Sequence, residues 1–227
     1  MGLGKTVMLL ALICKYKETV QNESKTKKHR PTLVVAPLSL ISQWEEEINT
    51  KSSLSCLVCY GEQVKTKSSN DEYAVDVVIT TYGTMQAELQ RQKKSAGARG
   101  YNLLQQDWLR VILDEAHCIK NQHTLASKAC CAIEADYRWV VTGTIIHNSL
   151  DDVFGLLKFL RHQPWCEPAF WKTAITTEMN RTAVKQESND EDVLAEPSGM
   201  MVALGRVRRL LGPLMLRRTK NSLNADG

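Results

Sequence analysis

The chain lacks the features that mark several large classes of protein. No apolar run reaches the ~18 residues that a membrane-spanning helix needs. The N-terminus has neither the basic stretch nor the small-residue cleavage site of a secretory signal. Aromatic residues make up only 6% of the 227 residues, and the net charge is only +4, which is too small an excess to indicate a nucleic-acid partner by itself.

Cysteines do not form a pattern that would organise the fold. There are seven, an odd number in a chain of this length, which disfavours a disulfide framework and favours a reducing compartment. Cys56 and Cys59 have the spacing of half a zinc site, but no second Cys/His pair accompanies them, and we expect them in the core. With 43% hydrophobic and 24% charged residues, the composition is that of one large or two small globular domains.

The first six residues read M-G-L-G-K-T and precede an apolar run, which is the second half of a phosphate-binding loop. Gly2, Leu3 and Gly4 would turn backbone N–H groups toward phosphate oxygens, at the N-terminus of the helix that follows. Lys5 would supply a charge to the β- and γ-phosphates, and the hydroxyl of Thr6 would ligate Mg²⁺. A glycine turn before a helix, with a solvated lysine, is the alternative for this fragment alone.

The same motif is incomplete at its beginning. Its first position would fall two places before Met1, and the strand that leads into such a loop would lie further upstream. We therefore expect Met1 to be an internal methionine of a longer protein, and the sheet to lack its first strand.

Short β-branched runs alternate with helical segments along the chain. This alternation predicts an α/β fold, a parallel sheet with helices on both faces, in which ligands bind at the carboxyl ends of the strands. The expected strands are 32–36, 54–60, 76–81, 110–114 and 138–142; the expected helices are 6–16, 39–49, 150–160 and 202–211; the expected loops are 21–31 and 91–100.

One expected strand ends in two adjacent carboxylates. Residues 110–114 lead into D-E-A-H, so Asp114 can hold Mg²⁺ while Glu115 polarises an attacking water, as phosphoryl transfer requires. A lone acidic pair after a strand is weak, but a G-K-T about 110 residues upstream makes the combination specific. The small polar turn T-G-T at 142–144 follows another strand; a plain connection is its alternative.

Together these motifs resemble the first motor lobe of the Swi/Snf-type ATPases of helicase superfamily two. The segments that carry the resemblance occur in order: M-G-L-G-K-T, V-V-A-P-L-S-L-I-S-Q-W, V-V-I-T-T-Y, L-D-E-A-H-x-I-K-N, V-T-G-T-x-x-x-N-S-L-D-D and L-x-L-R-R-T-K. Within the family the chain is most similar to the Rad-five/Rad-sixteen and helicase-like transcription factor branch. The resemblance implies a RecA-like P-loop fold of which this chain is the first lobe, with ATP and Mg²⁺ as cofactors and a DEAH box.

The resemblance also implies a function. The family couples ATP hydrolysis to translocation on double-stranded DNA or nucleosomes, in chromatin remodelling or DNA repair, in the nucleus and without a membrane. Lys5, Asp114 and Glu115 would be catalytic, and His117 would link the nucleotide site to the T-G-T turn. The positions that match DNA-contacting segments are Pro37, Leu38, Ser39, Thr80, Thr81, Tyr82, Asn148, Arg217, Arg218 and Lys220.

A basic segment near the end of the chain fits DNA contact as well. Residues 206–220 hold six basic residues and no acidic one, whereas an acidic stretch at 187–192 offsets them in the net charge. Contacts with phosphates would position the protein without reading sequence. A solvated charged surface is the alternative for this segment.

Two departures from the family pattern bear on activity. Ile145 replaces a proline that stiffens the T-G-T turn, and His147 replaces an amide or acid, so we expect coupling to be affected more than nucleotide binding. The second lobe, which would bring the arginine finger, is not in this chain. Since that finger is worth on the order of 10³ to 10⁵ in rate, we expect negligible ATPase activity from these residues alone, whereas the parent protein would be an ATP hydrolase.

The expected organisation follows from these segments: an ATP-binding lobe at 1–180, an acidic flexible loop at 181–199, the end of the lobe at 200–220, and a tail at 221–227 toward the second lobe. Two other functions remain open. One is a non-catalytic remnant of such a motor that binds DNA or protein; the other is an unrelated P-loop enzyme such as a kinase or GTPase, against which the D-E-A-H box argues.

Overall fold

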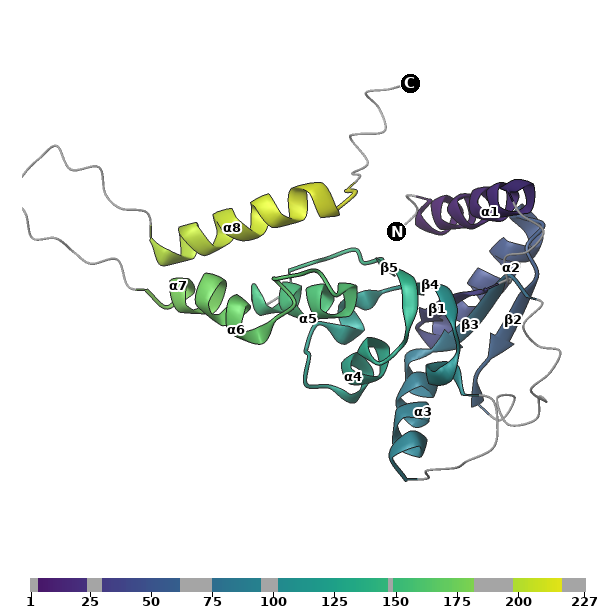
Figure 1. Cartoon of the computed structure of the whole chain (residues 1–227), viewed down its shortest axis with the longest axis horizontal. Helices are drawn as coiled ribbons and strands as arrows, with labels where there is room; N and C mark the ends of the chain where they lie inside the picture. Colours follow the sequence, from purple (N-terminus) through teal and green to yellow (C-terminus); the bar gives the residue numbers. More distant parts are fainter. Residues whose placement is uncertain are drawn as a thin grey trace, which may run out of the picture. The chain divides into compact units, whose positions relative to one another are not determined.

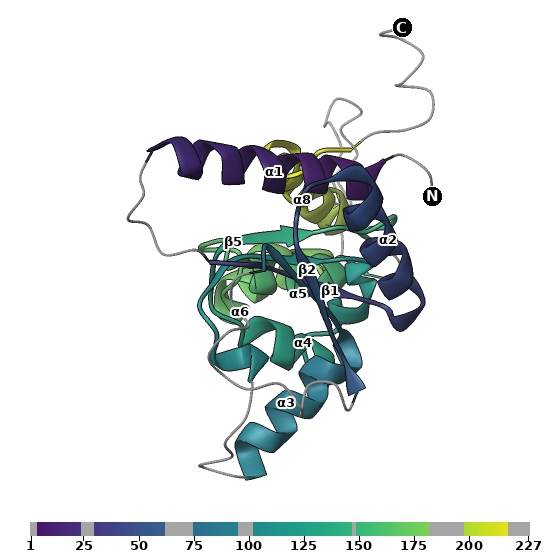
Figure 2. The same ribbon diagram turned by 90° about the vertical axis from the view of Figure 1, so that its right-hand side faces the viewer.

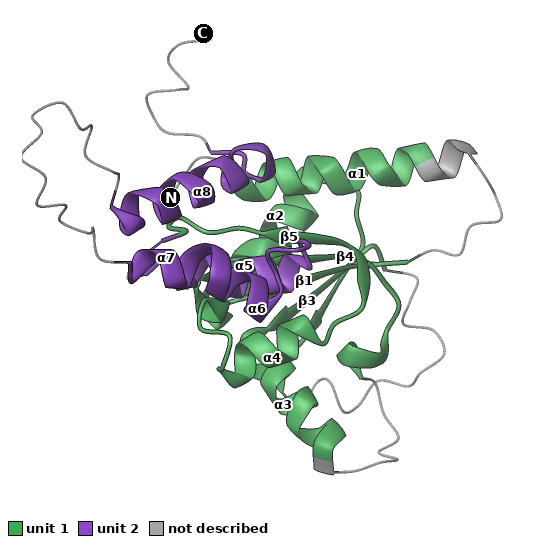
Figure 3. Cartoon of the chain, turned by 60° about the vertical axis from the view of Figure 1, so that its left-hand side comes forward, with its two compact units in different colours: residues 1–145 green, residues 146–227 purple. Residues whose placement is uncertain are grey.

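The computed structural model describes residues 4–23, 30–61, 75–94, 102–146, 149–181 and 198–217. The chain divides into two compact units, residues 1–145 and 146–227, which Figure 3 shows in different colours. Each unit is described by itself. Among the described residues, no helix combines the length and the apolar composition that crossing a membrane requires.

The first unit is built on a five-stranded sheet whose paired strands all run parallel, in the order β2-β3-β1-β4-β5 (Figure 1). Val34 aligns with Ile79 on one side and with Ile112 on the other, so the strands end at the same edge. The predicted parallel sheet is therefore confirmed. The strands are β1 (Thr32–Ala36), β2 (Cys56–Cys59), β3 (Val77–Thr81), β4 (Trp108–Leu113) and β5 (Ala135–Val140).

Helices cover both faces of this sheet (Figure 2). Helices α1 (Lys5–Glu23) and α2 (Ile41–Lys51) lie on one face, and α3 (Tyr82–Lys94) and α4 (Leu125–Cys131) lie on the other. Short 3-10 turns precede α2 (η1, Leu38–Leu40), precede β4 (η4, Leu103–Gln105) and follow β4 (η5, Ala116–Ile119).

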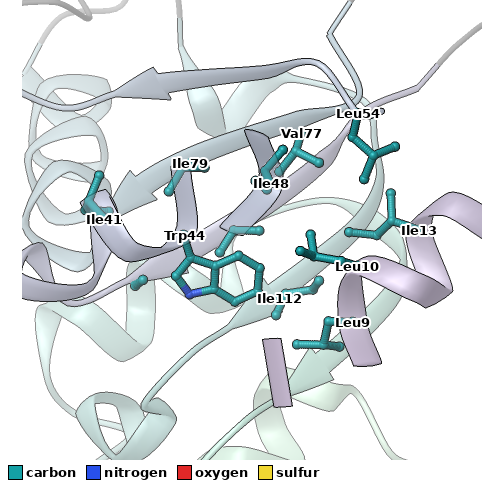
Figure 4. Packing of buried hydrophobic residues seen from close by; sticks show 12 residues of the cluster. Leu9, Leu10, Ile13, Ile41, Trp44, Ile48, Leu54, Val77, Ile79 and Ile112 are labelled. Carbon is teal, nitrogen blue, oxygen red and sulfur yellow. The ribbon is translucent and has the colours of Figure 1, made fainter. Parts of the chain in front are cut away.

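The core between the sheet and its first two helices forms around Trp44 of α2 (Figure 4). Leu10 and Ile13 from α1 and Ile79 and Ile112 from the strands belong to the same buried cluster. Each fully buried aliphatic side chain of this kind stabilises the fold by about 1.5–3 kcal/mol. The cluster fixes α1 and α2 on the sheet, and with them the residues at the first turn of each helix.

A buried arginine ties α1 to the strands below it. Arg110 of β4 is 3% exposed, and its guanidinium lies over the rings of Tyr16 and Tyr137, at 5.5 and 5.7 Å from their centroids. Nη1 donates to Oγ1 of Thr32 at 3.3 Å. Burial lowers the pKa of Arg110, and the two aromatic rings partly compensate for the lost hydration of its charge.

The strands differ in burial according to their place in the sheet. Every residue of β1, β3 and β4 is buried, whereas every residue of β5, at the edge, is exposed or half-buried, with Tyr137 and Trp139 exposed. This explains why the strand was predicted at 138–142, although β5 begins at Ala135. The polar first half of an edge strand lacks the apolar run used to find it.

Other predicted boundaries are corrected as well. Helix α1 continues to Glu23, so residues 21–23 are helical rather than loop, and α3 continues through residues 91–94 of the expected loop 91–100. Strand β4 starts at Trp108, two residues before the predicted strand. The helix expected at 202–211 is longer at both ends, since α8 spans Gly199–Leu214. The expected acidic loop lies almost wholly outside the described residues.

The second unit consists of helices: α5 (Asp151–Leu160), α6 (Pro168–Trp171), the π-helical turn η6 (Lys172–Thr176), α7 (Thr177–Met179) and α8. Trp171 packs on Phe154 with ring centroids 5.5 Å apart and donates its indole N–H to Asp151 at 2.7 Å. At Gly199 a Cβ would lie 1.9 Å from the carbonyl oxygen of Glu178, so only glycine permits this close approach of α8 to α7.

Candidate functional site

Helix α1 begins at the carboxyl edge of the sheet with the G-K-T residues. Gly4 has φ +66°, in the left-handed region that favours glycine, and its carbonyl accepts the N–H of Met8 at 3.0 Å. The N–H groups of the first helical turn have no partner within the helix, so this terminus suits an anion. Gly2 and Leu3 lie outside the described residues.

Asp114 follows β4 at the same edge and is held on several sides. Its N–H donates to the carbonyl of Val35 at 2.9 Å, and its side chain is 7% exposed. Oδ1 accepts the backbone N–H of Glu115 at 2.9 Å, and Oδ2 accepts the indole N–H of Trp44 at 2.9 Å. The carboxylate therefore has a fixed orientation.

Glu115 occupies an unusual backbone conformation between two basic side chains. Its φ of 46° and ψ of 49° lie in the left-handed region, which costs a residue with a Cβ about 1 kcal/mol. Its Oε1 lies 3.9 Å from Nζ of Lys5, and its Oε2 lies 3.2 Å from Nδ1 of His117. Strain of this kind collects at functional positions, and it turns Glu115 toward the start of α1.

A cavity of about 340 Å³ brings the predicted nucleotide residues together. Its wall includes Lys5 and Thr6 from α1 together with Asp114 and Glu115, although these pairs are about a hundred residues apart in sequence. The complete lining is Gly4, Lys5, Thr6, Val7, Leu9, Leu40, Gln43, Trp44, Glu47, Lys51, Asp114, Glu115 and Val141.

One side of this cavity is a row of α2 residues that the sequence reasoning did not select. Nε2 of Gln43 donates to Glu47 at 2.9 Å, and Nζ of Lys51 lies 3.4 Å from the other carboxylate oxygen of Glu47. The spacing i, i+4, i+8 places the three on one face of a helix. That spacing could have identified them as a row, but nothing in the sequence shows that the row lines the same cavity as Lys5 and Thr6.

The T-G-T segment follows β5 and joins the acidic segment through the backbone. Val141 N–H donates to the carbonyl of Leu113 at 2.8 Å, and Ala116 N–H donates to the carbonyl of Val141 at 2.9 Å. Oγ1 of Thr142 accepts the N–H of Thr144 at 3.3 Å, which closes the small turn. Asn148 lies outside the described residues. The contact that the structure gives the His117 side chain is the one with Glu115, so its proposed link to the T-G-T turn stays a prediction.

The segments predicted to contact DNA differ in exposure. In the turn before α2, Leu38 and Ser39 are exposed and Pro37 is half-buried. In contrast, Thr80 is fully buried and its hydroxyl donates to the carbonyl of Cys59 at 2.6 Å. A ligand therefore has access to side chains of the first segment, whereas the side chain of Thr80 is enclosed.

The two residues after Thr80 are also directed into the fold. Thr81 is 9% exposed and its hydroxyl accepts the N–H of Thr84 at 3.1 Å. Tyr82 is 6% exposed, and its hydroxyl donates to the main-chain carbonyl of Asp114 at 2.7 Å. Burial raises the pKa of Tyr82 far above its ordinary value, so the phenol remains a donor at neutral pH.

The basic residues near the end of the chain belong to the second unit. Arg208, Arg209 and Arg217 are exposed, whereas Arg206 donates to the carbonyl of Ala174 at 2.6 Å and lies 3.6 Å from Glu178. Arg218 and Lys220 lie outside the described residues.

A second cavity, of about 540 Å³, lies within the second unit. Trp165, Phe170 and Arg206 are part of its lining, and none of the predicted nucleotide residues borders it. The chemistry of phosphate recognition points to the smaller cavity, because that one combines a helix N-terminus, a lysine and two carboxylates.

Parallel strands in this order, with a helix N-terminus and an acidic pair at their carboxyl edge, define an α/β lobe of the RecA-like class. Comparison with known families gives the particular family. The chain belongs to the SNF2-related domain family, which it matches over residues 1–226.

Curated relatives of the chain are DNA repair proteins. It is 34% identical to DNA repair protein rad5 of Emericella nidulans over 249 residues and 34% identical to DNA repair protein rad8 of Schizosaccharomyces pombe over 244 residues. These alignments cover all of this chain but 19% and 20% of the relatives. The chain therefore spans about a fifth of the length of these proteins, and it is similar to the branch that the motifs indicated.

Solved structures agree with this fold. The SWI2/SNF2 ATPase core of Sulfolobus solfataricus in complex with double-stranded DNA has a TM-score of 0.68 and 27% identity, covering 97% of this chain and 39% of that chain. The same ATPase core domain in another structure gives a TM-score of 0.65 and 26% identity. The predicted RecA-like fold is confirmed.

Proposed function

We propose that the chain is the ATP-binding lobe of a DNA-dependent ATPase that translocates on double-stranded DNA. The observation that carries this proposal is the single cavity shared by Lys5, Thr6, Asp114 and Glu115. Membership of the SNF2-related family and the similarity to DNA repair proteins support the choice of DNA repair, in the nucleus, as the process. Chromatin remodelling is the other process that the motifs allow.

The residues of the cavity fit a nucleotide with Mg²⁺. The α1 N-terminus and Lys5 would hold the β- and γ-phosphates, and the hydroxyl of Thr6 and the carboxylate of Asp114 would hold the metal. Each Asp114 oxygen accepts one hydrogen bond in this structure and has a second lone pair left for a ligand. Mg²⁺, when bound, would neutralise charge that develops on the transferred phosphoryl group.

Glu115 is the residue that we propose to polarise the attacking water. It lies next to Lys5, where the terminal phosphate would be bound, and Oε1, the oxygen that does not contact His117, is the one nearer to Lys5. Removing the carboxylate would leave nucleotide binding largely intact while abolishing hydrolysis. That separation of binding from chemistry is what a water-orienting residue requires.

Nucleotide binding by the 227-residue chain tests the proposal directly. A fluorescent ATP analogue should bind in the presence of Mg²⁺, and ATP but not AMP should displace it, because the phosphate loop contacts the β- and γ-phosphates. Hydrolysis by this chain alone should be negligible, whereas a longer protein that continues into a second lobe should hydrolyse ATP when duplex DNA is added. Absence of Mg²⁺-ATP binding by the folded chain would reject the proposal.

One observation favours a second candidate, a non-catalytic remnant that binds DNA or protein. Ile145 stands where the family pattern has proline, directly after the T-G-T turn. Without that proline the turn is less restricted, and coupling of hydrolysis to movement would be impaired. Replacement Ile145→Pro in the longer protein separates the two: a translocase that works already should change little, whereas a remnant should gain DNA-stimulated hydrolysis or remain without it.

A further inference from the structure

Asp114 receives hydrogen bonds from two side chains that lie far from it in the sequence. The indole N–H of Trp44 donates to Oδ2 across 70 positions of sequence, and the hydroxyl of Tyr82 donates to the main-chain oxygen across 32 positions. Both donors are buried, at 2% and 6% exposure. These contacts are more than packing, because each one uses the polar atom of a large aromatic side chain.

The hydrogen bond from Trp44 is accepted by the carboxylate of Asp114, the group that would hold the metal. An N–H donor to a carboxylate is a charge-assisted hydrogen bond, stronger than one between neutral groups. With Oδ1 held by the N–H of Glu115 and Oδ2 held by Trp44, rotation of the carboxylate about its last bond is blocked. The remaining lone pairs therefore keep one direction relative to Thr6, which lines the same cavity.

Tyr82 acts on the backbone of the same residue. Its hydroxyl fixes the carbonyl of Asp114, and the next residue, Glu115, turns into the left-handed conformation. The phenol therefore holds the peptide at the point where the chain leaves β4. Without that bond the peptide between Asp114 and Glu115 has more freedom.

We propose that Trp44 and Tyr82 are positioning residues that orient Asp114 for the Mg²⁺ that accompanies the nucleotide. This inference rests on the proposed function. It adds two residues that would act through their hydrogen bonds to Asp114, without touching phosphate or metal. Trp44 fixes the carboxylate and has the larger effect; Tyr82 fixes the main chain and has the smaller one. Outer partners that orient a metal-binding carboxylate contribute strongly to affinity for the metal.

The test measures how much Mg²⁺ strengthens nucleotide binding. Affinity of the 227-residue chain for a fluorescent, non-hydrolysable ATP analogue is determined in EDTA and in saturating Mg²⁺, and the ratio of the two affinities is the magnesium enhancement. In Trp44→Phe the enhancement should fall about tenfold, since hydrogen bonds to charged groups are worth that order of affinity. In Tyr82→Phe it should fall about two- to threefold, because the lost donor is neutral and its acceptor is a main-chain carbonyl.

Trp108→Phe is the matched control. Trp108 is a fully buried tryptophan at the start of β4, and its indole N–H donates to the carbonyl of Leu103 at 2.9 Å. The change removes the same kind of donor as Trp44→Phe, but at the opposite end of the strand that leads to Asp114. It should lower thermal stability about as much as Trp44→Phe and leave the magnesium enhancement within about twofold of the wild type.

A double-mutant cycle with Asp114→Asn decides whether Trp44 acts through the carboxylate. Asp114→Asn should lower the enhancement without abolishing it, because Thr6 and the phosphates would still hold the ion, and adding Trp44→Phe should then lower it no further. An unchanged enhancement in Trp44→Phe, or an equal loss with and without Asp114→Asn, overturns the inference while leaving the proposed function in place. A wild-type chain that binds no nucleotide rejects both.

Discussion

The two edges of the same sheet differ in how closely their charged side chains are paired. At the amino edge, where the strands start, Arg30 donates to Asp107 and Asp136 at 2.5 Å, and Lys17 donates to Asp76 at 2.8 Å. At the carboxyl edge, Lys5 and Glu115 stand 3.9 Å apart around a cavity. The first edge has satisfied its charges within the fold, whereas the second has left groups available to a ligand.

The difference indicates that the amino edge contributes mainly to stability, whereas the carboxyl edge is suited to binding a ligand. At the amino edge, the side chain of Asp76 is 6% exposed and its pair with Lys17 contributes to stability, whereas the more exposed pairs of Arg30 contribute less. The strained Glu115 and the loosely paired Lys5 contribute little to stability, since their charged atoms are 3.9 Å apart and both side chains are partly solvated. Substitutions at the two edges should therefore have opposite consequences, and four of them break or sharpen the comparison.

The largest effect is expected at Asp76, at the amino edge. Oδ2 of Asp76 accepts from Lys17 and from both the N–H and the hydroxyl of Ser55. Asp76→Ala should lower the free energy of unfolding by about 3 kcal/mol, because three hydrogen bonds to this buried carboxylate, one of them from a charged lysine, are lost. Denaturant unfolding measures this; Asp107→Ala, which removes an exposed acid from the same edge, should cost no more than about 1 kcal/mol. Equal losses of stability in Asp76→Ala and Asp107→Ala would show that burial of Asp76 does not increase its contribution.

The next effect is expected at Lys5, at the carboxyl edge, and it concerns binding instead of stability. Lys5→Ala should weaken binding of an ATP analogue by roughly 30-fold, the worth of a hydrogen-bonded charge, with little change in the unfolding transition. Lys15→Ala is the matched control, since Lys15 is an exposed lysine on the same helix. Fluorescence titration measures the affinity of both variants. If Lys5→Ala lost as much stability as Asp76→Ala, the two edges would not differ in what they contribute.

Glu115 should give a smaller effect, and of the opposite sign. Glu115→Gly removes the left-handed strain and should raise the free energy of unfolding by up to about 1 kcal/mol, a shift in Tm of about 2–4 °C. Glu115→Gln keeps the side-chain size and the strain, and should leave Tm unchanged. Calorimetry compares the three proteins. A Glu115→Gly variant less stable than Glu115→Gln would show that the backbone there is not strained.

The smallest effect depends on pH. The hydrogen bond from Arg30 holds the pKa of Asp136 below its ordinary value, so the unfolded chain takes up the proton first as pH falls. The contribution of this pair is therefore present at neutral pH and is lost as pH falls through the folded-state pKa. Asp136→Asn should lower stability by less than about 1 kcal/mol at pH 7, and the difference from the wild type should shrink at pH 3. A stability difference between Asp136→Asn and the wild type that grows in acid would contradict a lowered pKa of Asp136 in the folded state.

The sequence predicted those parts of the fold that local patterns determine. Strand 32–36 was found with its exact bounds because a β-branched run stops at Pro37, and the G-K-T residues and the acidic pair, which line one cavity, were selected from their residue types. Helix α3 was not predicted, since it starts with Y-G-T directly after β3 and has a polar sequence that resembles a loop. Local propensity is weak in such a segment, and packing against the sheet decides its conformation.

The parts of the site that were missed depend on contacts between distant residues. Trp44 reads as an ordinary core residue of an amphipathic helix, and its pairing with Asp114 exists only once α2 is folded onto the sheet. The left-handed backbone of Glu115 follows from where η5 and the T-G-T segment hold the chain, not from any preference of glutamate. Tyr82 was placed with the DNA contacts by resemblance, whereas the structure directs its hydroxyl to Asp114.

The position of Trp44 on α2 has a thermodynamic consequence. The turn at 37–40, with exposed Leu38 and Ser39, leads directly into α2, and Trp44 lies one helical turn further on. Any ligand that shifts this helix also shifts the donor of Asp114, so we expect its binding to be linked to the proposed affinity of the site for Mg²⁺ and nucleotide. Linkage of this kind is reciprocal: the factor by which such a ligand strengthens nucleotide binding equals the factor by which the nucleotide strengthens binding of that ligand.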